Sequence, residues 1–393
     1  MAIRVSIIVP TRNRPAMAAL AVRAALAAAG RDDEVVVADN GDSPLILDSS
    51  DARLQTLRAD RVYSMPDNWE RGVRAARGQD LLVLSDKHRL VPGSLDHLLG
   101  ARRRSDDVVS YTYATFSQHL GPSDVNRLDA IASAPGILNY LQSGPQRIER
   151  SSRETLKDWY ATVRYRPERP MLYSSLVPRQ VVDDVVRARG RFFQGMAPDV
   201  SSGLHILAAR RTYVETNVTA VLTHFPSADT RWSNGASMSR GTEVANGFLQ
   251  EFAGSPLGRL PPLTTAVIFQ TLVEFSRIHP DLISPDMTDI SRFARVAAIE
   301  IESAGRADAA AMHWALLKAT QAGGICPRSL FEQLRTIVSS KVLGDTWLAR
   351  RLKRAFEKGG IPGRLAVAAT SIRTQSLRDA IELIVAANHP VRW

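Results

Sequence analysis

Three short polar segments each follow directly on an apolar run, and together they hold the side chains best suited to chemistry. They are residues 10–14 (Pro-Thr-Arg-Asn-Arg), 39–43 (Asp-Asn-Gly-Asp-Ser) and 85–89 (Ser-Asp-Lys-His-Arg). Carboxylates accept hydrogen bonds from the hydroxyl and N–H groups of a nucleoside, and cationic side chains neutralise a pyrophosphate. Asp86 and His88 are also both competent ligands for a divalent cation. Each segment alone fits an ordinary turn, but the three together predict one site for a ligand with a ribose and a pyrophosphate.

The elements that would position these segments alternate between strands and helices. Continuous apolar runs predict buried strands, and Ala-rich or amphipathic stretches predict helices. The predicted strands are residues 3–9, 34–38, 55–58, 81–84 and 108–113, and the predicted helices are residues 15–29, 68–76 and 92–104. This alternation indicates an α/β domain with a mostly parallel sheet covered on both faces. Ligands bind such a sheet beyond the carboxyl ends of its strands, where the three polar segments fall.

The later part of the chain changes character twice. Residues 117–170 are polar and irregular, which predicts loops with short helices, whereas residues 171–222 return to mixed α/β character. A Ser-, Asn- and Gly-rich stretch at residues 225–241 predicts a loop, and a Pro-rich stretch at residues 255–262 predicts a linker. The helices predicted beyond it are residues 264–278, 290–304, 308–322, 329–339, 345–358 and 374–387. We therefore expect a domain boundary near residue 255, with a mainly helical C-terminal region.

The composition narrows the classes of protein. The 393 residues include 50 Lys and Arg against 40 Asp and Glu, a formal net charge of +10. A basic surface suits anionic partners, but no zinc-ligand spacing or aromatic-basic RNA motif is present, so we expect no nucleic-acid partner. The single cysteine, Cys326, cannot form an internal disulfide, and no stretch approaches the roughly 20 apolar residues of a membrane span. These features favour a cytoplasmic protein.

Four segments in the first hundred residues resemble the family 2 glycosyltransferases. Residues 5–13 resemble the opening of that family, and residues 35–43 resemble its second strand with a nucleotide-binding aspartate. Residues 65–72, followed by Ala-Arg-Gly at 76–78, resemble its N-x-x-x-G…A-x-G helix. Residues 82–93 fall where the family has its D-x-D segment before a Pro-Gly helix start. The order and the spacing of all four agree with the family over about residues 3 to 100.

The resemblance implies a GT-A fold, which is Rossmann-like, and a nucleotide-diphosphate sugar as donor. The GT-A domain would span residues 1–254, with a nucleotide-binding half at about 1–115 and an acceptor-side half at about 116–254, and the helical domain would span residues 255–393. By position, Thr11 and Asp39 would contact the nucleoside, Asn68 would lie near the donor, and Asp86 would contact the ribose or a metal. The full set of expected donor-binding residues is Pro10, Thr11, Arg12, Arg14, Asp39, Asn68, Asp86 and Lys87.

One position departs from the family pattern. His88 stands where the family has its metal-binding aspartate. The family usually uses Mg²⁺ or Mn²⁺, so the resemblance implies a divalent metal held by Asp86 and His88. The alternative is that metal binding is weak or absent, and that Lys87 and Arg89 supply the positive charge instead.

The resemblance also points to a catalytic base. Residues 193–200, Phe-Gln-Gly-Met-Ala-Pro-Asp-Val, resemble the segment in which the family carries an acid at a helix start. Asp199 there would take the proton from an acceptor hydroxyl in an inverting transfer. The alternative is that Asp199 serves as a helix N-cap, a common use of aspartate.

These features together predict a hexosyltransferase-type enzyme of polysaccharide biosynthesis. It would move a sugar from a nucleotide-diphosphate donor to a hydroxyl of a glycan, a lipid-linked precursor or a small molecule. The basic run at residues 350–354 would let a C-terminal helix touch an anionic membrane, at its inner, cytoplasmic face. Because the metal motif is altered, the alternative is a catalytically inactive relative that acts as a binding or scaffold protein.

Overall fold

The computed structural model describes residues 2–118, 130–133, 146–163, 169–226, 260–284, 287–304, 309–322 and 372–374. The chain divides into two compact units. The first comprises residues 1–158, 165–232 and 371–393, and the second comprises residues 159–164 and 233–370. The domain boundary expected near residue 255 and the helices expected at residues 329–339, 345–358 and 374–387 lie outside, or almost wholly outside, the described residues, so they stay predictions.

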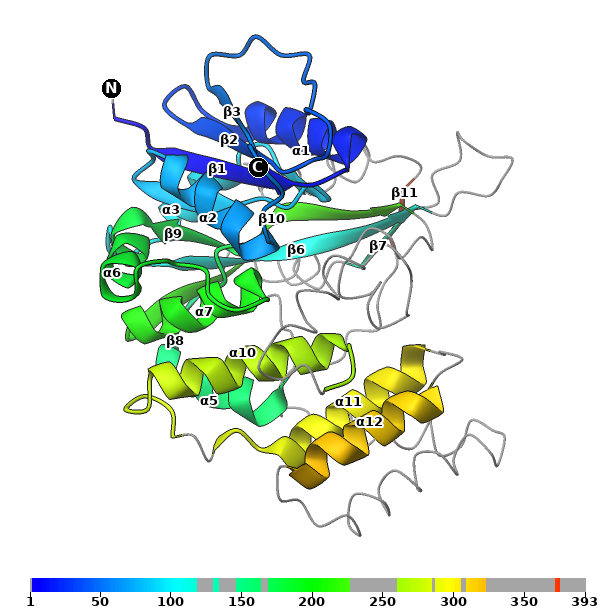
Figure 1. Ribbon diagram of the computed structural model, residues 1–393. Coiled ribbons are helices and arrows are strands. Elements are labelled where there is room, and N and C mark those ends of the chain that lie inside the picture. The colour runs from blue at the N-terminus through cyan, green and yellow to red at the C-terminus, as the bar shows by residue number, and fades with distance from the viewer. Residues whose placement is uncertain are drawn as a thin grey trace. The chain divides into compact units, whose positions relative to one another are not determined.

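Four parallel strands begin the first unit. They are β1 (Val5–Thr11), β2 (Glu34–Asp39), β3 (Leu54–Arg58) and β4 (Asp80–Val83). They lie in the order β4-β1-β2-β3, of which Figure 1 labels β1, β2 and β3. All residues of β1 and β2 are buried, as the continuous apolar runs predict. Thr11 lies opposite Asp39 at the carboxyl ends of these two strands. The parallel arrangement therefore brings the three polar segments to one edge of the sheet.

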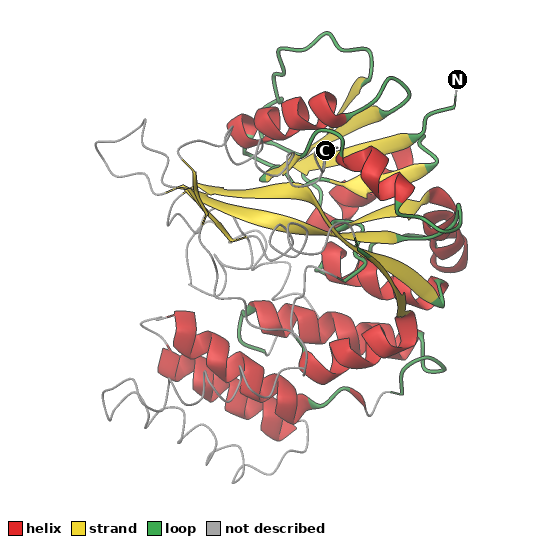
Figure 2. Ribbon diagram, turned by 180° about the vertical axis from the view of Figure 1, so that it is seen from behind, coloured by secondary structure: helices red, strands yellow, loops and turns green. Residues whose placement is uncertain are grey.

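Helices cover both faces of these strands, as Figure 2 shows from behind. On one face, Val5, Ile7 and Val9 share an apolar core with α1 (Pro15–Ala28) and α3 (Ser94–Gly100). On the other face, α2 (Met65–Ala75) packs against Ile8. A Cβ atom at Gly72 of α2 would lie 2.6 Å from Ile8 Cγ2, so this glycine permits the close approach. The expected α/β arrangement with two covered faces is confirmed.

Beyond β4 the sheet continues with strands of mixed direction. They are β5 (His88–Leu90), β6 (Val109–Gln118), β7 (Ala130–Ser133), β8 (Arg147–Ser151), β9 (Ser175–Pro178), β10 (Thr212–Pro226) and β11 (Ile372–Thr374). β9 pairs antiparallel with β4 and β6, and the long β10 pairs with β6 in parallel and with β5 and β8 antiparallel. Two helices, α6 (Arg179–Arg189) and α7 (Pro198–Ala209), follow β9.

The expectation that residues 117–170 hold only loops and short helices is wrong in part. This stretch contains the strands β7 and β8, and α5 (Ser152–Thr162) spans three turns. β8 pairs with β10 from Thr212 to Thr216. The residues of β8 form a strand because they pair with β10, which lies more than 60 residues further along the chain. A local sequence pattern does not reveal such a partner.

The second unit is helical in its described part. The helices α10 (Thr264–Ile278), α11 (Ile290–Ala304) and α12 (Ala309–Ala322) coincide with three predicted helices to within one residue. Phe269 of α10 stacks on Phe293 of α11, with ring centroids 4.5 Å apart. Glu300 of α11 accepts the backbone N–H groups of Thr264 and Thr265, each at 2.8 Å, and so satisfies two donors at the start of α10.

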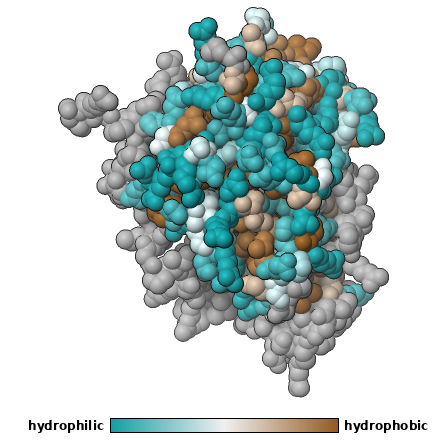
Figure 3. Space-filling model, turned by 90° about the vertical axis from the view of Figure 1, so that its left-hand side faces the viewer, coloured by the Kyte–Doolittle hydropathy of each residue, from teal (hydrophilic) through white to brown (hydrophobic). Residues whose placement is uncertain are grey.

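The surface of the described residues is polar with scattered apolar positions. The most exposed large apolar side chains are those of Ile46, Val62 and Leu282, which lie far apart in the sequence. On the face drawn in Figure 3, hydrophilic residues separate the apolar ones. Among the described residues no helix is both long and apolar enough to cross a membrane.

Candidate active site

The carboxyl edge of the sheet brings together three residues that the sequence singles out. Asp86 follows β4, and its Oδ2 accepts a hydrogen bond from Thr11 Oγ1 at 3.1 Å. Thr11 in turn lies opposite Asp39 in the strand register. All three residues are buried, although buried polar groups are costly without partners. Thr11, Asp39 and Asp86 therefore form one continuous polar edge.

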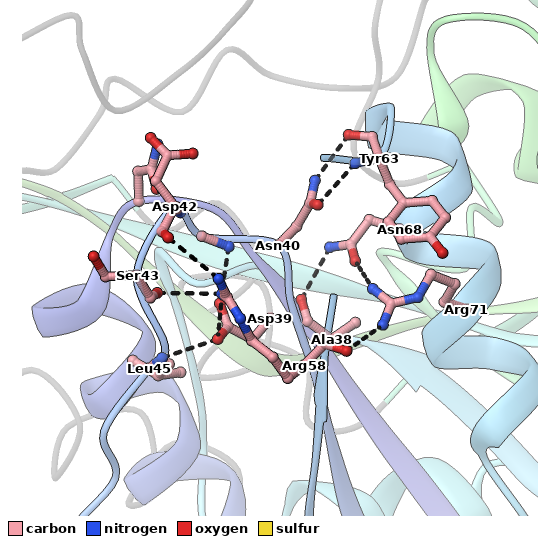
Figure 4. Close-up of polar contacts among 12 residues, drawn as sticks. Ala38, Asp39, Asn40, Asp42, Ser43, Leu45, Arg58, Tyr63, Asn68 and Arg71 are labelled. Carbon is pink, nitrogen blue, oxygen red and sulfur yellow. Dashed lines mark hydrogen bonds and ion pairs between the residues drawn. The ribbon is translucent and has the colours of Figure 1, made fainter. Parts of the chain in front are cut away.

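Asp39 organises the loop that follows β2 (Figure 4). Its Oδ1 accepts the N–H of Gly41 at 2.9 Å, and its Oδ2 accepts the N–H of Leu45 at 2.9 Å. Arg58, at the end of β3, adds an ion pair to Oδ2 at 3.0 Å. A carboxylate offers about four lone-pair sites, so Asp39 holds its own loop and retains capacity for a nucleoside N–H or hydroxyl.

A second polar cluster ties α2 to the same edge (Figure 4). The Asn40 side chain makes two hydrogen bonds with the backbone of Tyr63, at 2.8 and 2.9 Å. Asn68 Nδ2 donates to the carbonyl of Ala38 at 2.9 Å, and Asn68 Oδ1 accepts from Arg71 at 3.0 Å. The Arg71 guanidinium also lies over the Tyr63 ring, 4.5 Å from its centroid. Asn68 thus lies beside the end of β2, and its contact with a donor stays a prediction.

The remaining residues of the first polar segment differ in their exposure. Pro10 is buried inside β1, opposite Ala38, so it shapes the strand end. Arg12 is exposed to solvent beyond the strand. Arg14 is half-buried, and its Nη1 forms an ion pair with Asp86 Oδ1 at 3.2 Å. Of the three, Arg14 is the residue that the structure joins directly to the Asp86 carboxylate.

Lys87 follows Asp86 in the chain, and its charge interacts with the carboxylates of Asp86 and Asp199. Burial lowers the pKa of its ammonium group, and the charges of Asp86 and Asp199 act against this shift. Asp199 comes from α7, more than a hundred residues along the chain. The charge of Lys87 is therefore felt both at the edge that carries Asp86 and at the predicted base, Asp199.

Asp199 is the second residue of α7, and it is not the N-cap. The N-cap is Ala197, and no side chain caps this helix. Asp199 Oδ1 accepts the N–H of Val200 at 2.9 Å, and its place in the first turn suits the helix dipole. Burial raises the pKa of the Asp199 carboxyl above its ordinary value, while the charge of Lys87 opposes this. A carboxylate with a raised pKa is a stronger base, as proton abstraction from a hydroxyl requires.

His88 lies in β5 among aromatic rings. Its Nε2 shares a hydrogen bond of 2.9 Å with the Tyr173 hydroxyl, and its ring packs 4.5 Å from the Tyr173 ring and 6.0 Å from the Tyr113 ring. Its Nδ1 is buried with no hydrogen-bond partner among the described residues. Burial, with the neighbouring charges of Lys87 and Arg89, lowers the pKa of His88 well below its ordinary value, so the imidazole is neutral at pH 7.

The donor set around His88 does not fit a divalent metal. No three His, Cys, Asp or Glu side chains gather closely enough to hold an ion in the part of the chain that the structure describes. Asp86 already accepts from Thr11 and Arg14, and the cation of Lys87 stands beside it. Metal ligation by Asp86 and His88 therefore stays a prediction without support from the geometry.

Arg89 stabilises the turn after β4. Its side chain is buried, and Nη1 donates to the carbonyls of Asp86 at 3.0 Å and of His88 at 2.8 Å. Burial lowers its pKa to about 10, so the guanidinium remains charged at pH 7. Because Nη1 donates to these two backbone carbonyls, Arg89 shapes the segment that carries Asp86 and Lys87.

Sequence reasoning missed two residues of the site. Tyr173 contacts His88 and stacks on the buried ring of Trp69, with centroids 6.1 Å apart. Glu70 in α2 accepts the N–H groups of Phe192 at 2.9 Å and Phe193 at 3.0 Å. Both contacts join residues that lie far apart in the chain, so no local pattern reveals them.

Residues 6–153 match the family model described as Glycosyl transferase family 2. This part of the chain is therefore similar to that family, and its mostly parallel, helix-covered sheet agrees with the GT-A fold that the resemblance predicts. No curated protein sequence matches the chain.

Two of the similar solved structures are crystal structures of S. aureus TarS 1–349. The complex with UDP is 12% identical, with a TM-score of 0.39, and the complex with UDP-GlcNAc is 11% identical, with a TM-score of 0.41. Each likeness covers 95% of this chain and 97% of the other. Both are too distant to assign a ligand or a residue role to this chain.

Proposed function

We propose that this protein transfers a sugar from a nucleotide-diphosphate donor to an acceptor hydroxyl, with inversion at the anomeric carbon. The observation that carries the proposal is the buried edge of Thr11, Asp39 and Asp86, where Thr11 donates to Asp86 and Arg14 pairs with it. The charge of Lys87, the next residue, interacts with both Asp86 and Asp199. The family match supports it independently, because it rests on residues 6–153 and does not include Asp199.

The chemistry needs one base and a site for the leaving group. The Asp199 carboxylate takes the proton of the acceptor hydroxyl while the oxygen attacks the anomeric carbon. The bond between that carbon and the diphosphate oxygen breaks on the opposite side, and its electron pair leaves with the nucleoside diphosphate. Negative charge therefore develops beyond Asp86, where Arg14 and Lys87 lie, and preorganised charge is most effective at such a place.

A substitution of Asp199 tests the proposal. We expect Asp199→Asn to keep the Kd for the donor within about threefold, because the amide has the same shape. We expect turnover to fall at least about 100-fold, the usual contribution of a general base. Hydrolysis of UDP-, GDP- and TDP-sugars is the assay, because water replaces an unidentified acceptor. Calorimetry gives the Kd.

The matched control is Asp106→Asn, at an exposed carboxylate of the same unit, which should change neither quantity. Unchanged turnover in Asp199→Asn would remove the base from the mechanism. Donor binding by a wild-type protein that neither transfers nor hydrolyses any sugar would favour the alternative, an inactive relative that acts as a scaffold.

The acceptor and the place of action extend this proposal. A hexose donor and a glycan, lipid-linked or small-molecule acceptor suit a role in polysaccharide biosynthesis in the cytoplasm. The net charge of +10 favours peripheral contact with an anionic membrane at its inner face. The basic run at residues 350–354, which would make that contact, lies outside the described residues.

A further inference from the structure

The segment after β4 lacks the second carboxylate that the family uses to hold a metal. The position expected to supply a second metal-binding carboxylate is His88, which is 1% exposed and lies within β5, paired with β10. Its Nε2 is engaged by Tyr173. A ring that is buried in a strand and hydrogen-bonded to a tyrosine is poorly placed to reach an ion beside Asp86.

The carboxylate of Asp86 is also committed to other partners. Oδ2 accepts from Thr11 and Oδ1 pairs with Arg14, at 3.1 and 3.2 Å. Mg²⁺ is usually bound by one or two carboxylates together with substrate phosphates. A divalent ion here would meet one carboxylate already neutralised by a guanidinium and, next to it, the ammonium of Lys87.

Lys87 has the position that charge neutralisation requires. It follows Asp86 directly in the chain, beside the Arg14–Asp86 ion pair, and its charge interacts with Asp86, Arg14 and Asp199. In the proposed function the nucleoside end of the donor binds at Asp86 and the base is Asp199, so the reacting bond would lie between these two residues. The diphosphate therefore passes the Lys87 ammonium, and Arg14 adds a second cation at the same edge.

We infer that Lys87, assisted by Arg14, binds and neutralises the donor diphosphate in place of a divalent metal. The inference rests on the proposed function and specifies how its leaving group is stabilised. An ammonium is a mobile point charge that suits phosphate oxygens, and an arginine adds directed N–H donors. These two side-chain cations offset the charge of the departing diphosphate without a metal ion.

Calorimetry of the full chain with UDP, GDP and TDP tests this. The nucleoside diphosphate that binds most tightly is titrated in EDTA and again with Mn²⁺ or Mg²⁺. We expect its Kd to agree within about twofold in all three conditions. We expect Lys87→Met to weaken binding at least about tenfold, the loss of one charge-assisted contact, whereas Lys87→Arg should stay within about threefold of the wild type.

Lys157→Met, at an exposed lysine of α5, is the matched control and should bind as the wild type does. Circular dichroism and thermal unfolding show whether Lys87→Met is folded; if it is not, the Lys87→Arg variant and the EDTA comparison decide. Binding that requires Mn²⁺ or Mg²⁺, or that is unaffected by Lys87→Met, overturns the inference and leaves the proposed function standing. Absence of binding by all three nucleotides in every condition overturns both.

Discussion

Asp199 shows how one residue acquires a reactive character from its surroundings. An aspartate in the first turn of a helix is ordinary, but the surroundings of this half-buried one desolvate it and raise its pKa, while the charge of Lys87 opposes the shift. For an acid with a raised folded-state pKa, the stability it contributes is present below its unfolded pKa and is lost as the pH rises through the folded pKa. Asp199→Asn should therefore be no less stable than the wild type at neutral pH.

The same shift predicts the pH dependence of turnover. The base works only when ionised, so activity should fall as the pH is lowered through the pKa of Asp199, at a pH above the ordinary value of 3.8. Lys87→Met removes the charge that opposes the shift, so the acidic limb of the kcat profile should move to higher pH. Lys157→Met should leave it in place. An acidic limb that is the same in all three proteins would mean that another group titrates.

The residues of the donor edge could be predicted because their signal is local. Each of Thr11, Asp39 and Asp86 follows a buried strand, and parallel strands place such ends together. The roles of Tyr173 and Glu70 could not be predicted, since the residues around each in the sequence do not indicate its distant partner. The sequence alone also does not show that His88 is buried in β5 and paired with β10, and this position determines what its ring can reach.

At the scale of elements, buried strands and long helices were the predictable part. The run Val35-Val36-Val37 and the helices α10 and α11 have uninterrupted patterns and appear as predicted. The helix predicted at residues 92–104 is shorter, because Gly93 adopts a left-handed φ of 78° as its N-cap and α3 ends at Gly100. β5 was missed since a charged three-residue segment becomes a strand only by pairing with β10.

Gly78, which follows α2, explains why a glycine stands in the A-x-G motif. A Cβ atom there would lie 2.4 Å from the backbone nitrogen of Ser6, so the turn could not keep its place against β1. We expect Gly78→Ala to lower the free energy of unfolding by about 1–3 kcal/mol, as overpacking does. Urea unfolding measures it.

Gly100→Ala is the control for this change. A Cβ at Gly100 meets nothing within 4 Å, and alanine favours a helix, so stability should change by less than about 0.5 kcal/mol. Equal stability of both variants and the wild type would show that β1 and the turn after α2 lie farther apart than described.

At the scale of the whole molecule, the net positive charge of +10 predicts attraction to an anionic membrane. Neutralising four basic residues should weaken sedimentation with vesicles rich in anionic lipid at least about tenfold, because each is worth about 1 kcal/mol near such a surface. The four are Arg350, Arg351, Lys353 and Arg354, each changed to Gln. The control changes four exposed residues of α5 and α6 to Gln, namely Arg153, Lys157, Arg187 and Arg189.

An equal loss of vesicle binding in both variants would indicate attraction by net charge alone. Unchanged binding of the variant at residues 350–354 would show that this run does not contact the membrane. Added salt should weaken binding of the wild type in either case, since surface charges are screened.

Glu70 has a practical consequence for anyone who screens random variants of this chain. Its carboxylate joins α2 to backbone 122 and 123 residues away, in the segment that leads into α7. A replacement there loosens the approach to Asp199 without touching any ligand. Variants at this internal acid will therefore be recovered beside true active-site variants, and a folding assay on each hit is needed to separate them.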